Sequence, residues 1–185
     1  MGSNGEGKST FVSLISGILK PNEGTILHHP QAKIGCFEQH DVEKLVNNYK
    51  NLTGIEYLSQ LYPEAENQEL YNLLGSFGVS GSLGNNPIYT LSGGQVVRLI
   101  MSSIFYLKPH FVVLDEPTNH LDTETIEVMI KNLKEFKGSV IIVSHDQYFV
   151  DQIAERVYYL KKQKFHKLEE GVKEYIKIVK KDMKL

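Results

Sequence analysis

Apolar residues recur along this chain with two different spacings, and their alternation predicts the order of its helices and strands. Apolar positions three or four residues apart indicate helices, which we expect at residues 11–19, 93–107, 123–136, 147–156 and 171–184. Short apolar runs are typical of buried strands, which we expect at residues 25–28, 33–38, 111–114, 139–143 and 157–160. Strands that alternate with helices predict an α/β fold around a mostly parallel core sheet.

The middle of the chain departs from this alternation. Between residues 52 and 84, leucines and aromatic residues keep helical spacing, while Pro63, Gly75, Gly78 and Gly81 punctuate it. Together with the helix at 93–107, this stretch predicts a small helical subdomain at residues 52–107. We expect it to lie beside the sheet within a single domain that spans residues 1–185.

Composition places few limits on this picture. The 185 residues, 41% hydrophobic and 23% charged, suffice for one soluble domain with a sizeable core or a core with a small helical appendage. No apolar run approaches membrane-spanning length, and the N-terminal sequence resembles no targeting signal. Cys36 is the single cysteine, so an intrachain disulfide is excluded, which fits a reducing compartment. We expect a cytoplasmic protein without a membrane partner.

Charge is distributed unevenly along the chain. Residues 161–185 carry nine lysines and four acidic residues, a formal net charge of +5, whereas the whole chain carries −2. This segment is predicted to be a basic C-terminal hairpin and helix. Such lysines are most often a solvated face, but they could also contact the phosphates of RNA.

The first residues match the phosphate-loop pattern G-x-x-x-x-G-K-[ST] and run directly into a predicted helix. In this pattern backbone N–H groups wrap the phosphates, Lys8 neutralises their charge, and the Ser9 hydroxyl meets Mg²⁺. A flexible glycine-rich terminus is the alternative interpretation. The candidate nucleotide-binding residues are Gly2, Ser3, Asn4, Gly5, Gly7, Lys8, Ser9 and Thr10.

Two carboxylates follow the apolar strand predicted at residues 111–114. This arrangement would place Asp115 in the Mg²⁺ shell and Glu116 beside an attacking water, which makes Glu116 the candidate general base. The paired acids could also simply begin a loop.

Two more polar side chains are predicted at strand ends, where α/β proteins bind ligands. His145 follows the strand at 139–143 and could touch a γ-phosphate. Adjacent residues point in different directions, so Ser144, His145 and Asp146 do not form a hydrolase triad. Gln39 follows the strand at 33–38, where its amide could sense both Mg²⁺ and water.

A second anion-binding loop lies in the middle of the chain. Ser92, Gly93, Gly94 and Gln95 follow Leu91 and open a helix, so that backbone N–H groups and a positive helix end face outward. Because the chain already has a phosphate loop at residues 2–10, this second loop is predicted to address a nucleotide held by another domain.

In this order the motifs resemble those of the ATP-binding-cassette (ABC) ATPases over essentially the whole chain. The corresponding features are the Walker A loop at 2–10, the Q-loop at Gln39, the signature at 91–95, the Walker B strand at 111–116, the D-loop at Asp122 and the switch histidine His145. Residues 115–122 look more specifically like the ABC-F branch, the soluble translation-associated members, and most like the second cassette of its eukaryotic members.

The resemblance implies ATP and Mg²⁺ as ligands. Gly7 and Lys8 would hold phosphates, Ser9 and Asp115 would ligate Mg²⁺, and Glu116 would handle the water. Gln39 would contact the metal and, with His145, sense the γ-phosphate. The signature residues Ser92, Gly93, Gly94 and Gln95 would contact ATP on an opposing cassette.

The family's mechanism is ATP-driven closure of two cassettes, which ABC-F members couple to the ribosome or its assembly. A ribosome or ribosomal RNA partner is therefore expected. The chain begins at the first glycine of the phosphate loop, so the strand and the adenine-stacking aromatic that normally precede that loop lie outside it, and we expect a truncated cassette. Two alternatives remain open: the nucleotide-binding subunit of an ABC transporter, and a nucleotide- or ribosome-binding module that does not hydrolyse ATP.

Overall fold

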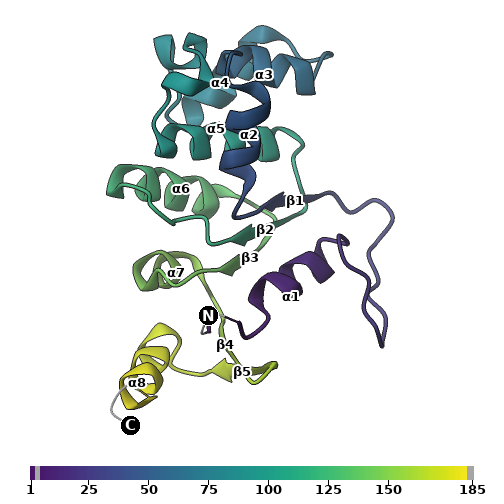
Figure 1. Cartoon of the computed structure of the whole chain (residues 1–185), viewed down its shortest axis with the longest axis vertical. Helices are drawn as coiled ribbons and strands as arrows, with labels where there is room; N and C mark the ends of the chain where they lie inside the picture. Colours follow the sequence, from purple (N-terminus) through teal and green to yellow (C-terminus); the bar gives the residue numbers. More distant parts are fainter. Residues whose placement is uncertain (3–4, 183–185) are drawn as a thin grey trace.

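Three parallel strands form the centre of the molecule in the computed structural model, which describes residues 1–2 and 5–182. They are β1 (Ile34–Phe37), β2 (Phe111–Asp115) and β3 (Ser139–Val143), in the order β1-β2-β3 (Figure 1). Phe37 lies beside Leu114, and Asp115 beside Val143. Because the strands are parallel, the residues that follow all three meet at one edge of the sheet.

Helices cover both faces of this sheet. On one face, Val12 of α1 (Lys8–Ile15) packs against Val113 and Val143. On the other face, Val112 and Leu114 pack in the large core that includes α5 (Gly93–Tyr106) and α6 (Thr123–Glu135). β2 is buried on both faces, as its continuous apolar run predicts. The predicted α/β fold with a parallel core sheet is confirmed.

Helices also fill the stretch of chain between β1 and β2. Before α5 they are α2 (Asp41–Tyr49), α3 (Gly54–Leu61), α4 (Asn67–Ser76) and two short 3₁₀ turns, η1 (Gly81–Asn85) and η2 (Ile88–Thr90). Thr53 begins α3 with a capping box. The Thr53 hydroxyl accepts from the backbone N–H of Glu56, and the Glu56 carboxylate accepts from the backbone N–H of Thr53. Leu58, Leu70 and Leu99 are fully buried where α3, α4 and α5 meet.

The C-terminal part of the chain forms a second, smaller core. After α7 (Gln147–Ile153), strands β4 (Val157–Lys161) and β5 (Lys164–Leu168) form an antiparallel hairpin that leads into α8 (Val172–Asp182). Val150, Tyr159, Leu168, Val172 and Tyr175 pack together between them. Figure 1 shows this hairpin and helix at the end of the molecule farthest from α3 and α4.

Two sequence predictions are wrong near the N-terminus. The strand predicted at residues 25–28 does not form, and Leu27 there is 89% exposed, because a strand needs a neighbour for its hydrogen bonds. The first helix ends at Ile15 rather than at residue 19. The Ser16 hydroxyl donates back to the Val12 carbonyl and Gly17 turns the chain with a φ of 78°, which leaves Ile18 exposed.

β3 is bonded on one side only within residues 1–2 and 5–182. Its Ser139 N–H donates to the His110 carbonyl, and its Val143 carbonyl accepts from the Glu116 N–H. Successive residues of a strand direct their backbone N–H and C=O groups to opposite sides. The N–H and C=O groups of Val140 and Ile142 therefore point away from β2. They face a groove of about 990 Å³ between β3 and β4.

We expect hydrogen exchange to distinguish the two sides of β3. The amides of Val140 and Ile142 should exchange at least about tenfold faster than that of Ile141, because only the Ile141 amide faces β2. The measurement is residue-resolved amide exchange by NMR, with Val113 in the doubly paired β2 as the protected reference. Equal protection of the three amides would show that the groove side of β3 is bonded in solution.

Candidate nucleotide-binding site

The phosphate loop, residues 2–10, leads into α1 at the edge of the sheet where the strands end. Gly7 is the N-cap of α1, and a helix that begins with glycine leaves its first N–H groups to an external acceptor such as a phosphate. Lys8 donates from Nζ to the Gly2 carbonyl at 2.8 Å, which folds its side chain back over the loop. Ser9 and Thr10 are exposed in the first turn of α1. Ser3 and Asn4 lie outside the described residues.

The end of β2 carries the two carboxylates in different environments. Asp115 is the last residue of the strand and is 5% exposed. Glu116 follows with a φ of 50°, a left-handed conformation that costs a residue with a side chain about 1–3 kcal/mol and is concentrated at functional sites. The backbone N–H of Glu116 donates to the Val143 carbonyl at 2.8 Å. This bond fixes the turn against the end of β3.

Glu116 and His145 form a polar pair after the ends of β2 and β3. The Glu116 carboxylate accepts from the backbone N–H of His145 at 3.2 Å through Oε2, and its Oε1 lies 3.4 Å from the His145 Nε2. The Glu116 side chain is 9% exposed and that of His145 is 43% exposed. Among the described atoms Oε1 receives no hydrogen bond, although it is buried. A buried carboxylate oxygen in this state is poised to accept from a ligand.

Lys8 of the phosphate loop and Glu116 at the end of β2 both affect the pKa of the Met1 ammonium. Burial lowers the pKa of the Met1 ammonium, the Lys8 cation lowers it further, and the Glu116 carboxylate opposes them by raising it. Lys8 and Glu116 are therefore both within electrostatic reach of the same group. Lys8 and Val143, the last residue of β3, also line the same groove between β3 and β4, and Val12 of α1 packs against Val143.

Two residues that the sequence did not single out for binding fix the loops after β2 and β3. The hydroxyls of Thr118 and Ser144 lie 3.3 Å apart and share a hydrogen bond, and both residues are buried. Ser144 also accepts from the Asp146 N–H at 3.0 Å. A sequence signal that could have found them is that each closely follows an apolar strand. Gln39 follows β1 at the same edge of the sheet and is exposed.

The signature residues cap α5. The Ser92 side chain accepts from the Gln95 N–H at 3.3 Å, and the Gln95 side chain accepts from the Ser92 N–H at 2.9 Å. In this way Gln95 stabilises the helix start. Ser92 and Gly93 are exposed, and the Ser92 hydroxyl retains a proton to donate.

Gly94 is buried at the point where α5 meets α6. A Cβ there would lie 2.4 Å from the Thr125 hydroxyl and 3.1 Å from the Asp122 carboxylate. Asp122 is the N-cap of α6 and accepts from the Thr125 N–H at 2.8 Å, and this hydrogen bond lowers its pKa. The predicted signature and D-loop residues therefore touch each other, whereas α5 and α1 pack against opposite faces of the sheet.

The residues present suit Mg²⁺. Asp115 and Ser9 offer the hard oxygen donors that this ion prefers, and Gln39 offers a carbonyl oxygen. The buried Oε1 of Glu116 adds a polar atom without a hydrogen bond among the described residues. Within those residues no three His, Cys, Asp or Glu side chains are grouped to hold a metal by themselves.

Comparison with known proteins shows the family of the chain. The family model described as "ABC transporter" matches residues 1–119. The chain belongs to the ABC transporter family. This membership supports ATP binding and hydrolysis by an ABC-type domain. Even so, none of the helices in the described part of the chain is long and apolar enough to cross a membrane.

Relatives with similar sequences include ABC-F proteins. The chain is 42% identical over 150 residues to ABC transporter F family member 3 of Arabidopsis thaliana. The aligned residues cover 81% of this chain and 21% of that protein. The chain is 39% identical over 175 residues to ATP-binding cassette sub-family F member 3 of Rattus norvegicus, covering 95% of the chain and 24% of that protein. The chain thus spans between a fifth and a quarter of these relatives.

Solved ABC structures share the fold. CbiO1 from Clostridium perfringens, part of an ABC transporter complex, superposes with a TM-score of 0.76 at 26% identity, over 98% of this chain and 80% of that one. A dimeric ATP-binding cassette, MJ0796, in a post-hydrolysis state with ADP and phosphate, superposes with a TM-score of 0.69 at 26% identity, over 91% and 84% of the two chains.

Proposed function

We propose that this chain is one half of a pair of ABC-F cassettes and hydrolyses ATP when a second cassette closes on it. The observation that carries the proposal is the Glu116–His145 pair, which presents a buried carboxylate oxygen at the edge of the sheet. The test is ATP turnover by the purified chain with Glu116 intact and with Glu116 replaced by Gln.

The chemistry assigned to these residues is an in-line attack of water on the γ-phosphate. Glu116 orients the water and accepts its proton as the oxygen–phosphorus bond forms, and ADP leaves with the bridging oxygen. Lys8 and the backbone of residues 2–10 neutralise and hold the phosphates. Ser9, Asp115 and Gln39 would hold Mg²⁺, which when bound would supply further charge neutralisation at the phosphates. His145 contacts the γ-phosphate and reports whether it is present.

The signature loop serves the ATP of the opposing cassette. Ser92, Gly93, Gly94 and Gln95 start a helix whose exposed N-terminal end attracts an anion. α5 and α1 cover opposite faces of the sheet, which supports the proposal that this loop and the phosphate loop of one chain serve different nucleotides. The similarity to a dimeric cassette supports the pairing. Residues 52–107, with the signature, are proposed to act as the helical subdomain of the cassette.

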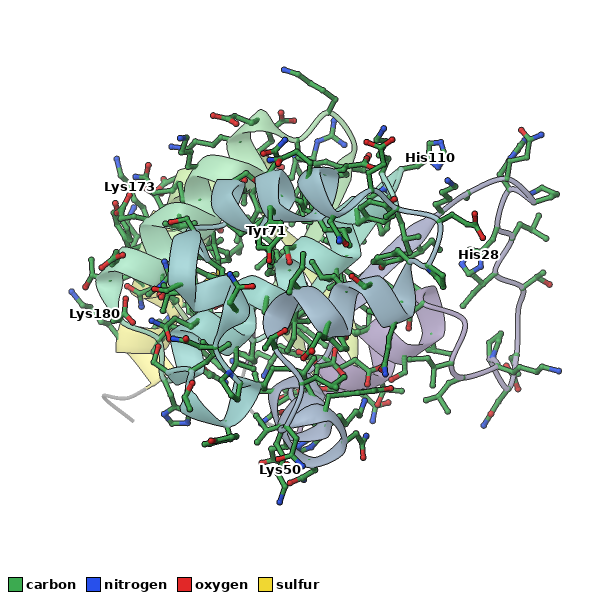
Figure 2. All side chains as sticks on the ribbon, turned by 90° about the horizontal axis from the view of Figure 1, so that it is seen from above. His28, Lys50, Tyr71, His110, Lys173 and Lys180 are labelled. Carbon is green, nitrogen blue, oxygen red and sulfur yellow. The ribbon has the colours of Figure 1, made fainter. Side chains whose placement is uncertain are left out.

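The cellular role proposed for this ATPase is in translation or ribosome biogenesis, in the cytoplasm. The sequence similarity to ABC-F proteins favours this role over that of a transporter subunit. The basic segment at residues 161–185 supports a contact with ribosomal RNA. Figure 2 shows Lys173 and Lys180 of α8 extending outward at the edge of the molecule.

Charge reversal on α8 is expected to weaken ribosome binding more than about fivefold, because each lysine that contacts a phosphate releases a counterion. The variant replaces Lys173, Lys180 and Lys181 with Glu, and the measurement is co-sedimentation with purified ribosomes at several salt concentrations. The matched control replaces Lys20, Lys50 and Lys131, which are exposed on other elements, and makes the same change in net charge.

Equal ribosome binding by the two triple variants would refute the proposed contact through α8. Binding to a membrane protein complex in place of ribosomes would favour the transporter alternative. ATP binding with no turnover, even in a paired state, would favour the non-hydrolysing module.

A further inference from the structure

The β4–β5 hairpin lies directly against the phosphate loop. The backbone N–H of Lys162 donates to the Glu6 carboxylate at 2.6 Å, and the Leu160 N–H donates to the Met1 carbonyl at 2.9 Å. The rings of Phe11 and Phe165 meet edge to face, with centroids 4.8 Å apart. A backbone bond, a side-chain bond and an aromatic contact thus join residues 1–11 to the hairpin.

The approach of the two segments is close. A Cβ on Gly2 would lie 2.6 Å from the Leu160 carbonyl oxygen, so the loop can begin here only with glycine. The hairpin in turn is anchored away from the loop, since Tyr159 packs edge to face on Tyr175 and Leu168 is buried beside Val172. The hairpin is therefore a fixed support for the loop.

Glu6 contacts the turn of the β4–β5 hairpin. Lys162 and Gln163 form the turn between β4 and β5, with φ angles of 49° and 60°, as a two-residue hairpin turn requires. The bond to Glu6 uses a backbone N–H, so it does not depend on which side chain stands at position 162. Glu6 lies between Gly5 and Gly7, which both have positive φ angles that glycine adopts without a steric cost.

We propose that Glu6 is a positioning residue for the nucleotide: by binding the turn of the β4–β5 hairpin, it holds the phosphate loop in the open shape that accepts phosphates. This inference rests on the proposed ATP-binding function of the loop. Glu6 itself need not touch ATP, and as a carboxylate it repels a triphosphate. Its placement in the loop is explained by the hairpin contact.

The direction in which the Kd for ATP changes when Glu6 is replaced tests this positioning role. Removing a negative charge next to a phosphate site should by itself tighten ATP binding. If positioning dominates, Glu6→Ala should instead raise the Kd for ATP about three- to tenfold, since a hydrogen bond to a charged group is lost. Glu6→Gln keeps an acceptor oxygen for the Lys162 N–H and should bind ATP at least as tightly as the unmodified chain. Glu23→Ala, on the exposed loop after α1, is the matched control.

Three measurements decide the outcome. The Kd comes from a fluorescent ATP analogue, the stability of the free protein from its Tm, and the order of the loop from amide exchange of residues 5–10 without nucleotide. We expect faster exchange in Glu6→Ala only, with an unchanged Tm. Unchanged or tighter ATP binding by Glu6→Ala would overturn the proposal, and so would a Tm that falls together with the affinity. If the unmodified chain binds no ATP, the proposed function fails, while amide exchange still reports on the contact.

Discussion

Replacing Glu116 with Gln is expected to lower ATP turnover about 10²- to 10⁴-fold, the range over which a positioned general base contributes. The amide has nearly the shape of the carboxylate and can still accept from the His145 N–H, so the turn after β2 should be preserved. What it loses is the ability to take a proton from water. ATP binding should therefore remain, and the loss should appear in kcat and not in KM.

The measurement is steady-state phosphate release at several protein concentrations, because a site completed by a second chain turns over faster per chain as pairing increases. Glu127→Gln serves as the control, since Glu127 is a carboxylate of α6 that bonds the Tyr148 hydroxyl. Equal turnover by the Glu116→Gln variant and the unmodified chain would refute the catalytic role of Glu116. No turnover by either, with ATP bound, would identify a module that does not hydrolyse.

Replacing Gly94 with Ala is expected to destabilise the fold by about 1–3 kcal/mol, the usual cost of overpacking a closely packed contact. The added Cβ would lie 2.4 Å from the Thr125 hydroxyl, far inside contact distance. Neither helix start can move easily, because Ser92 and Gln95 cap α5 while Asp122 caps α6. The two helices must separate, and with them the signature and D-loop residues.

The neighbouring glycine supplies the control. A Cβ on Gly93 meets nothing within 4 Å, so Gly93→Ala should leave the stability unchanged or raise it by up to about 1 kcal/mol, the helix propensity that alanine gains over glycine. The free energy of unfolding is measured by urea denaturation of the two variants and the unmodified chain. If Gly94→Ala is as stable as Gly93→Ala, the contact between α5 and α6 is looser than the structure shows.

The elements with strong local signals were predictable from the sequence. Ser92 and Gln95 form the capping box that their spacing indicates, and the helix after them ends at Tyr106, one residue before the predicted end. The apolar runs at 111–114 and 139–143 became β2 and β3, because a short apolar run between turn signals is typical of a buried strand. The strand predicted at 25–28 does not form. A strand depends on pairing with a neighbouring strand, and the local sequence does not show whether such a neighbour exists.

The candidate site was predictable as a set of motifs but not as a geometry. Phosphate-loop, strand-end and signature residues could be chosen by type and spacing. The contacts that hold them could not, because they join distant positions: Thr118 and Ser144 are 26 residues apart, and Glu6 and Lys162 are 156 apart. No periodic pattern encodes such pairs.

The sequence by itself determined the class of this protein, because its chemistry requires particular residues at fixed local spacing: a glycine-rich loop before a helix, acids after a buried strand and a capped helix start at Ser92. The tertiary structure decided how those residues meet. It buried the Glu116 oxygen beside His145, pressed Gly94 against Asp122, and set the phosphate loop against the β4–β5 hairpin. The reason is that packing and strand pairing depend on distant partners, which only the folded chain brings into contact.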